Sequence, residues 1–113
     1  MSTRVFKIVD EFSITPSART AEEGKFPGVE LRNMIKPLLQ EAIDNDGKLL
    51  IDLDEAAGYG TSFLEEVFGG LIRVEGFKYE DIIAHLEIKS DEEPELIEEI
   101  MQDIEDAYTE ISK

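Results

Sequence analysis

The chain has 113 residues, of which 42% are apolar, and its 27 acidic and 11 basic residues give a formal net charge of −16. This length suits a single core, so we expect residues 1–113 to form one domain. The negative charge repels phosphate groups, which disfavours direct binding to nucleic acid or to an anionic membrane surface. The chain contains no cysteine, which excludes disulfide bonds, a thiolate nucleophile and cysteine-ligated metal sites.

No segment of the sequence has the length and hydrophobicity of a membrane-spanning helix. Crossing a bilayer takes about 20 consecutive, mainly apolar residues, and charges interrupt every long segment here. The first residues, MSTRVFKIVDEF, also lack the extended apolar core of a signal peptide. We therefore expect a cytoplasmic protein with no membrane partner.

The first part of the chain predicts a strand, a loop and a helix. Residues 4–10 are rich in β-branched and aromatic side chains, which is typical of an outer strand. Residues 13–28 mix prolines and glycines with polar residues and are expected to form a loop. Residues 29–45 place apolar side chains at every third or fourth position, as an amphipathic helix does. Pro37 within this pattern predicts either a kink or the start of a second helical segment.

The sequence from residue 48 to residue 74 predicts the centre of the fold. Residues 49–53 are almost continuously apolar, which is typical of a central strand buried on both faces. A helix is expected from Ser62 to Val74. Its start matches the S-x-x-E capping box, in which the Ser62 hydroxyl accepts a hydrogen bond from the Glu65 amide and the Glu65 carboxylate accepts one from the Ser62 amide.

The last third of the chain predicts a short helix, a third strand and a long helix. The short helix is expected within residues 77–85, the strand over residues 86–88, and the long helix from about residue 91 onward, with Ser90 or Asp91 as its N-cap. Strands and helices thus alternate along the chain. This order predicts an α/β fold in which helices cover a small mixed β-sheet.

The turn between the central strand and its helix combines glycines with hydroxyl side chains. Gly58, Tyr59 and Gly60 precede Thr61 and Ser62, which stand where the helix is expected to begin. A phosphate at this position would be stabilised by exposed amides and by the helix dipole. The glycines match neither a dinucleotide-binding motif nor a P-loop, so no cofactor is predicted.

The remaining polar residues do not assemble into a complete catalytic set. The single histidine, His85, lies in no motif and is expected to be structural. Asp52 and Asp54 resemble the D-x-D pair that binds magnesium in aspartate-based phosphatases, but two carboxylates are too few for that site. We therefore predict no metal site and no enzyme, and rank a magnesium-dependent phosphatase using Asp52 and Asp54 third among the functions considered.

The segment IDLDEAAGYGTSFLEEVFGGLIR resembles the strand–turn–helix segment of STAS domains, the fold of bacterial anti-anti-sigma factors. It is more similar still to STAS-like domains of undefined function (DUF4325-like), and the resemblance is strongest over residues 48–73. In the anti-anti-sigma factors this turn reads D-S-S-G, and a kinase of the histidine-kinase-like ATPase superfamily phosphorylates its second serine. The resemblance therefore implies a STAS-like fold in which Ser62 matches the phosphorylated position and Thr61 the hydroxyl before it.

The turn also departs from the anti-anti-sigma pattern. Gly60 replaces the Asp of that pattern, Phe63 replaces its Gly, and Glu65 and Glu66 add carboxylates that would repel a phosphate on Ser62. Because the capping box gives Ser62 a structural role, helix capping and phosphorylation remain alternatives for this residue.

Three functions follow from these observations. The first is a regulatory module that binds a partner protein through the surface from Gly58 to Glu66, and the resemblance implies a histidine-kinase-like ATPase as that partner. The second is an acidic inhibitor that uses its charge to mimic nucleic acid. The phosphatase is the third.

Overall fold

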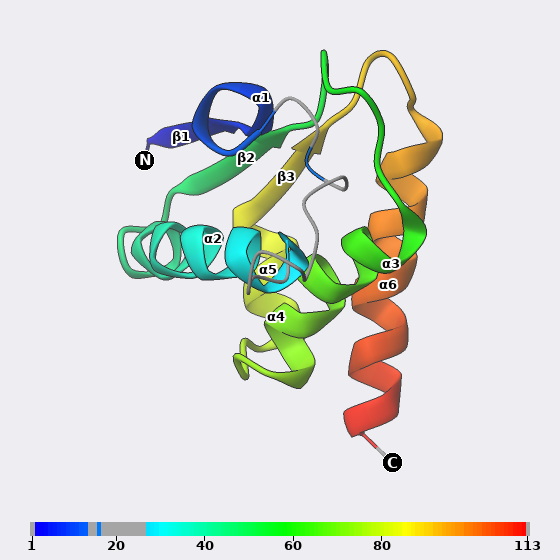
Figure 1. Ribbon diagram of the computed structural model, residues 1–113. Coiled ribbons are helices and arrows are strands. Elements are labelled where there is room, and N and C mark those ends of the chain that lie inside the picture. The colour runs from blue at the N-terminus through cyan, green and yellow to red at the C-terminus, as the bar shows by residue number, and fades with distance from the viewer. Residues whose placement is uncertain (1, 14–15, 17–26, 113) are drawn as a thin grey trace.

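The computed structural model describes residues 2–13, 16 and 27–112 and has an α/β fold (Figure 1). Its strands are β1 (Thr3–Lys7), β2 (Lys48–Asp52) and β3 (Leu86–Lys89). The helices described are α1 (Ile8–Glu11), α2 (Pro27–Asp44), α3 (Thr61–Leu64), the π-helical η3 (Glu65–Gly69), α4 (Gly70–Arg73), α5 (Tyr79–His85) and α6 (Glu95–Ile111). The predicted α/β class and the alternation of strands and helices are confirmed.

The three strands form one sheet in the order β1–β2–β3, so β2 is the predicted central strand. Both pairings are parallel, with Phe6 opposite Ile51 and Ile51 opposite Ile88. The described sheet is thus parallel, and the expectation of a mixed sheet was wrong. The physical reason is that a helix joins each strand to the next, and such a crossover returns the chain to the same end of the sheet.

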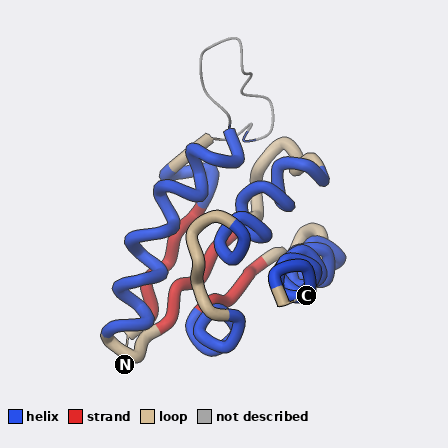
Figure 2. The backbone as a smooth tube through the Cα atoms, turned by 90° about the horizontal axis from the view of Figure 1, so that it is seen from below, coloured by secondary structure: helices blue, strands red, loops and turns tan. Residues whose placement is uncertain are grey.

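The main helices pack against one face of this sheet (Figures 1 and 2). Leu49 and Ile51 of β2 point into that layer and are fully buried. On the opposite face Val5 is 47% exposed and Leu50 is half-buried. The sheet is therefore covered more completely on one face than on the other, whereas the sequence predicted a central strand buried on both.

The first strand is shorter than the predicted span of residues 4–10. It ends at Lys7, and Ile8–Glu11 form one helical turn in which the Phe12 amide donates to the Ile8 carbonyl at 2.9 Å. Lys7 pairs with Asp52, the last residue of β2. Since the neighbouring strand ends there, residues after Lys7 have no partner in the sheet, and the fully buried Ile8 turns into the core instead.

Helix α2 begins at Pro27, two residues before the predicted start. Proline is favoured at the first helical position because its missing N–H is not needed there. The helix continues through Pro37 to Asp44 without a second start. Pro37 and Asn33 are both exposed, so solvent can hydrate the Asn33 carbonyl that the proline leaves without a donor. Of the predicted loop over residues 13–28, residues 14–15 and 17–26 lie outside the described part of the chain.

The C-terminal elements follow the prediction except at one helix start. Helix α5 and strand β3 lie where the sequence placed them, but α6 begins at Glu95, after Pro94. Ser90 is buried, and its hydroxyl donates to the Glu93 carbonyl at 2.7 Å, so neither Ser90 nor Asp91 is the N-cap. None of the described helices is both long and apolar enough to span a membrane.

Candidate functional site

The carboxyl ends of the three strands meet at one edge of the sheet, near the top of Figure 1. These ends are Lys7, Asp52 and Lys89. The segment from residue 53 to residue 60 leaves this edge and leads into α3. In open α/β sheets ligands bind beyond the carboxyl ends of the strands. The segment that leads into the turn therefore starts at the edge that the fold favours for ligand binding, and it then runs down beside α6 to α3 (Figure 1).

Thr61 and Ser62 are both exposed and form the first turn of α3. The N-cap is Gly60, with φ −77° and ψ 147°, and its carbonyl accepts a hydrogen bond from the Leu64 amide at 3.1 Å. No side chain caps this helix. The predicted capping box is therefore wrong, because the N-cap is Gly60, two residues before Ser62, and Ser62 stands inside the helix.

Tyr59 holds the turn against the body of the protein. Its hydroxyl donates to the Leu53 carbonyl at 2.8 Å, and its ring lies 6.2 Å from that of Phe63, which in turn lies 6.4 Å from that of Phe12. Burial, together with the nearby carboxylates, raises the pKa of Tyr59, so the phenol keeps its proton and remains a hydrogen-bond donor. Gly58 adopts φ 150°, which a residue with a side chain rarely does.

The carboxylates of Glu65 and Glu66 each face a guanidinium group. Glu65 contacts Arg73, and Glu66 Oε2 lies 3.5 Å from Nη1 of Arg32. Arg32 Nη1 also donates to the Glu66 carbonyl at 2.6 Å, within the π-helical turn. These pairings offset part of the negative charge that the sequence placed beside Ser62. Single π-helical turns are frequent at functional sites, where they re-aim backbone groups.

Asp52 and Asp54 form a hydrogen-bonded connection between two strand ends. The Asp54 amide donates to Asp52 Oδ1 at 2.9 Å, Lys89 Nζ donates to Asp54 Oδ2 at 2.6 Å, and the Glu92 amide donates to Asp54 Oδ1 at 3.1 Å. The Lys89 hydrogen bond lowers the pKa of Asp54. Both carboxylates are thus engaged with the protein itself, and no group of three or more metal-ligating side chains occurs within residues 2–13, 16 and 27–112.

Sequence reasoning missed the cations that pair with carboxylates at and beside this site, which are Lys7, Arg32, Arg73 and Lys89. Lys7 contacts Glu55, which adopts φ 72° after the end of β2. A lysine at the end of an outer strand, next to a D-x-D pair on the central strand, is the signal that could have found Lys89. The structural role predicted for His85 agrees with the 2.8 Å hydrogen bond between its Nδ1 and the Gly47 carbonyl.

A small surface cavity of about 140 Å³ lies at the opposite, amino-terminal edge of the sheet. It contains none of the predicted site residues. Its two cations are already paired, Arg4 with Glu11 at 2.8 Å and Lys48 with Glu87 at 3.4 Å. The residues that line it are Ser2, Arg4, Leu38, Glu41, Ala42, Asn45, Gly47 and Lys48.

The parallel sheet, its one-sided helical layer and the exposed turn after β2 define the chain as a STAS-like α/β domain. Residues 28–96 match the family described as "STAS-like domain of unknown function (DUF4325)", and the chain belongs to that family. The match includes α2, β2, the Gly58–Glu66 turn and β3, and it confirms the resemblance drawn from residues 48–73. No curated protein and no solved structure matches the chain.

Proposed function

We propose that this chain is a non-enzymatic regulatory module that binds a partner protein through the surface from Gly58 to Glu66. The partner is a histidine-kinase-like ATPase domain, and it phosphorylates Ser62 or Thr61. One observation carries this proposal: two exposed hydroxyls stand in the first turn of a helix whose cap is a glycine, so neither is engaged in capping. Membership of a STAS-like family supports the same reading.

The local electrostatics favour a phosphate on this turn. The helical path from Thr61 to Arg73 has its amino end here, and amides in a first helical turn have no carbonyl partner within the helix. A phosphate adds about two negative charges and three strong acceptors, which such amides and the helix dipole stabilise. The pairing of Glu65 with Arg73 and of Glu66 with Arg32 reduces the repulsion that these carboxylates would exert.

The experiment is a phosphorylation assay with radiolabelled ATP and a purified histidine-kinase-like ATPase domain. The wild-type chain should take up label, Ser62→Ala should lose most of it, and Thr61→Val should retain it. Thr109→Ala is the matched control, because Thr109 is also an exposed helical hydroxyl but lies on α6. Label that is absent from the wild-type chain, or that survives in the Ser62→Ala, Thr61→Val double variant, would refute the proposal.

A second candidate is an acidic inhibitor that occupies a nucleic-acid-binding groove. It is favoured by α6, which has no Lys or Arg and exposes carboxylates along its length, including Glu95, Glu98, Glu105, Asp106 and Glu110. A partner bound in this way should dissociate steeply with added salt. Its affinity should also be unchanged in the Ser62→Ala, Thr61→Val variant, which distinguishes it from the first candidate.

A further inference from the structure

Apolar side chains lie exposed where α4 and α6 end. Val74, the residue after α4, is 61% exposed, and Tyr108 and Ile111 on the last turns of α6 are 40% and 55% exposed. We refer to Val74, Tyr108 and Ile111 as the C-terminal shelf. Single exposed apolar residues are ordinary, but a group of them on adjoining elements marks an interaction surface.

Two contacts join the elements that carry the shelf. Arg73 Nε, next to Val74, lies 3.4 Å from Oε2 of Glu110, next to Ile111. Tyr108 stacks on Tyr79 of α5, with ring centroids 4.7 Å apart. Tyr108 and Ile111 are three residues apart and are therefore neighbours on the surface of α6. The end of α4, the start of α5 and the last turns of α6 thus form one corner of the molecule.

The shelf continues the buried face of α6 beyond the body of the protein. Ile111 lies four residues after the fully buried Ala107 and seven after Ile104, so all three share one side of the helix. Figure 1 shows the last turns of α6 running past α4 at the bottom of the molecule. At Ile111, which is 55% exposed, the described chain therefore covers the apolar stripe only in part. The buried residues of this stripe are Leu96, Ile100, Ile104 and Ala107.

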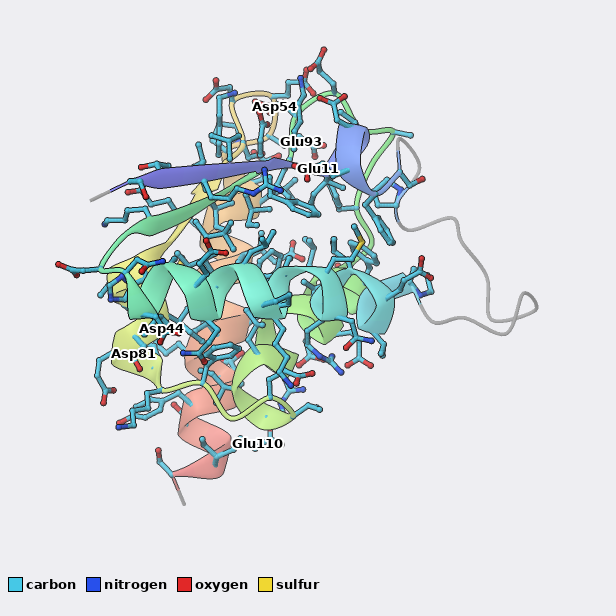
Figure 3. All side chains as sticks on the ribbon, turned by 90° about the vertical axis from the view of Figure 1, so that its left-hand side faces the viewer. Glu11, Asp44, Asp54, Asp81, Glu93 and Glu110 are labelled. Carbon is cyan, nitrogen blue, oxygen red and sulfur yellow. The ribbon has the colours of Figure 1, made fainter. Side chains whose placement is uncertain are left out.

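The charge around the shelf defines the partner that fits it. Asp106 and Glu110 are exposed beside it, and no Lys or Arg occurs between Asp91 and Ser112. Figure 3 shows Glu110 at the lower end of the molecule. Among the described residues, Lys78 is an exposed cation just before α5, four residues after Val74. A second copy would bring another −16 chain to the same corner, so like charges oppose self-association here.

We propose that the C-terminal shelf docks an amphipathic helix, rich in Lys and Arg, that belongs to a partner protein. Its apolar side chains, spaced three or four residues apart, pack on Val74, Tyr108 and Ile111, and its flanking cations face Asp106 and Glu110. None of the three shelf residues belongs to the Gly58–Glu66 turn, although Arg73 contacts both Glu65 of that turn and Glu110 beside the shelf. Docking at the shelf does not depend on phosphorylation.

The test is a titration of the isotope-labelled full chain with a synthetic amphipathic helical peptide made of leucine and lysine, followed by NMR. The largest shifts are expected at Val74, Tyr108 and Ile111. A Val74→Ser, Ile111→Ser double variant should weaken binding by about tenfold or more, as loss of central apolar contacts does. Val5→Ser is the matched control, because Val5 is similarly exposed but lies on β1, and it should leave the affinity unchanged.

A scrambled peptide of the same composition separates apolar docking from plain charge attraction, since it keeps the lysines but has no apolar face. Equal binding of both peptides, shifts spread over all acidic surfaces, or no binding at all would overturn the proposal. So would a dimer in analytical ultracentrifugation that the double variant dissociates, because a second copy would then be the occupant. Both substituted side chains are exposed, and a urea unfolding curve checks that the variant is folded. Ser62→Ala should bind the peptide as the wild type does, so this test and the phosphorylation assay fail independently.

Discussion

Arg32 of α2 donates from Nε to Oε2 of Glu75, just after α4, at 3.0 Å, with side chains only 5% and 10% exposed. Lys36 reaches the other oxygen of Glu75 at 2.9 Å. The hydrogen bond from Lys36, and then that from Arg32, lower the pKa of Glu75 against the opposing effect of burial. The same guanidinium donates to the Glu66 carbonyl in the π-helical turn. Arg32 therefore connects α2 to both ends of the η3–α4 segment, which begins within the Gly58–Glu66 surface.

Removing the Arg32 guanidinium should destabilise the protein strongly. Arg32→Ala leaves Glu75 buried with only Lys36 to face it, and breaking a buried ion pair from one side costs about 3–5 kcal/mol. Urea unfolding followed by circular dichroism measures the loss. Arg4→Ala is the control, because the Arg4–Glu11 pair is exposed and its removal should cost at most about 1 kcal/mol. Equal losses of unfolding free energy in the two variants would contradict the conclusion that Arg32 stabilises the protein through buried ion pairs.

The adjacent glycines 69 and 70 should respond in opposite directions to alanine. A β-carbon at Gly70 would lie 2.9 Å from Cδ of the buried Arg32 and would overlap its guanidinium, so Gly70→Ala should cost about 1–3 kcal/mol. A β-carbon at Gly69 meets only the ends of the Arg73 and Glu65 side chains, which are partly exposed and can move. Gly69→Ala should therefore gain up to about 1 kcal/mol from helix propensity. Thermal unfolding of both variants tests this order, and a reversal would refute it.

The carboxylate of Asp103 on α6 should make stability depend on pH near neutrality. Burial, then the negative charges of Glu99 and Asp106, raise the pKa of Asp103 to about 6, while Arg73 opposes them. Between about pH 4 and 6 the folded state therefore keeps a proton on Asp103 that the unfolded state has already released. Asp103 thus lowers the free energy of unfolding as the pH rises through that window. Glu75 has the opposite effect on the pH dependence of stability. Because its pKa is lowered, its contribution to the free energy of unfolding is present at neutral pH and is lost in acid.

Asp103→Asn should therefore stabilise the protein above about pH 6, by up to about 1 kcal/mol because Asp103 is partly exposed and solvent screens it. Below about pH 4 the gain should vanish, since the wild-type carboxyl is then protonated in both states. Urea unfolding curves across this range measure the difference between the two chains. Asp44→Asn, at an exposed helix end, is the control. A gain that is constant with pH would exclude this ionisation as its cause.

Most elements of the fold could be predicted because they depend on the local spacing of apolar side chains. The central strand, the helix from Ser62 to Val74 and strand β3 were each placed within one or two residues. The error at residues 8–10 has a non-local cause. Ile8 and Val9 favour a strand, but whether a strand continues depends on a partner, and β2 ends opposite Lys7.

The part of the candidate site that depends on local sequence could also be predicted. The exposed Thr61–Ser62 pair belongs to one contiguous segment, so the sequence displays it directly. Arg32 and Lys89 reach their partners from elements distant in sequence, and no local pattern reveals those contacts. Gly70, the second of two consecutive glycines in the predicted helix, was the available signal for Arg32, because glycine within a helix permits close approach by another group. Here that group is the side chain of Arg32.

Replacing Ser62 by alanine should leave the stability of the protein nearly unchanged. Since Gly60 is the N-cap and no side chain caps α3, the free energy of unfolding should change by less than about 0.5 kcal/mol. A Ser62 that completed a capping box would instead cost about 0.5–2 kcal/mol when removed. Gly60→Asp is the informative counterpart, because an aspartate at the N-cap can accept from the first amides and should add a few tenths of a kcal/mol. If Ser62→Ala unfolds like the wild type, loss of phosphate label in that variant reports loss of the acceptor hydroxyl and not loss of structure.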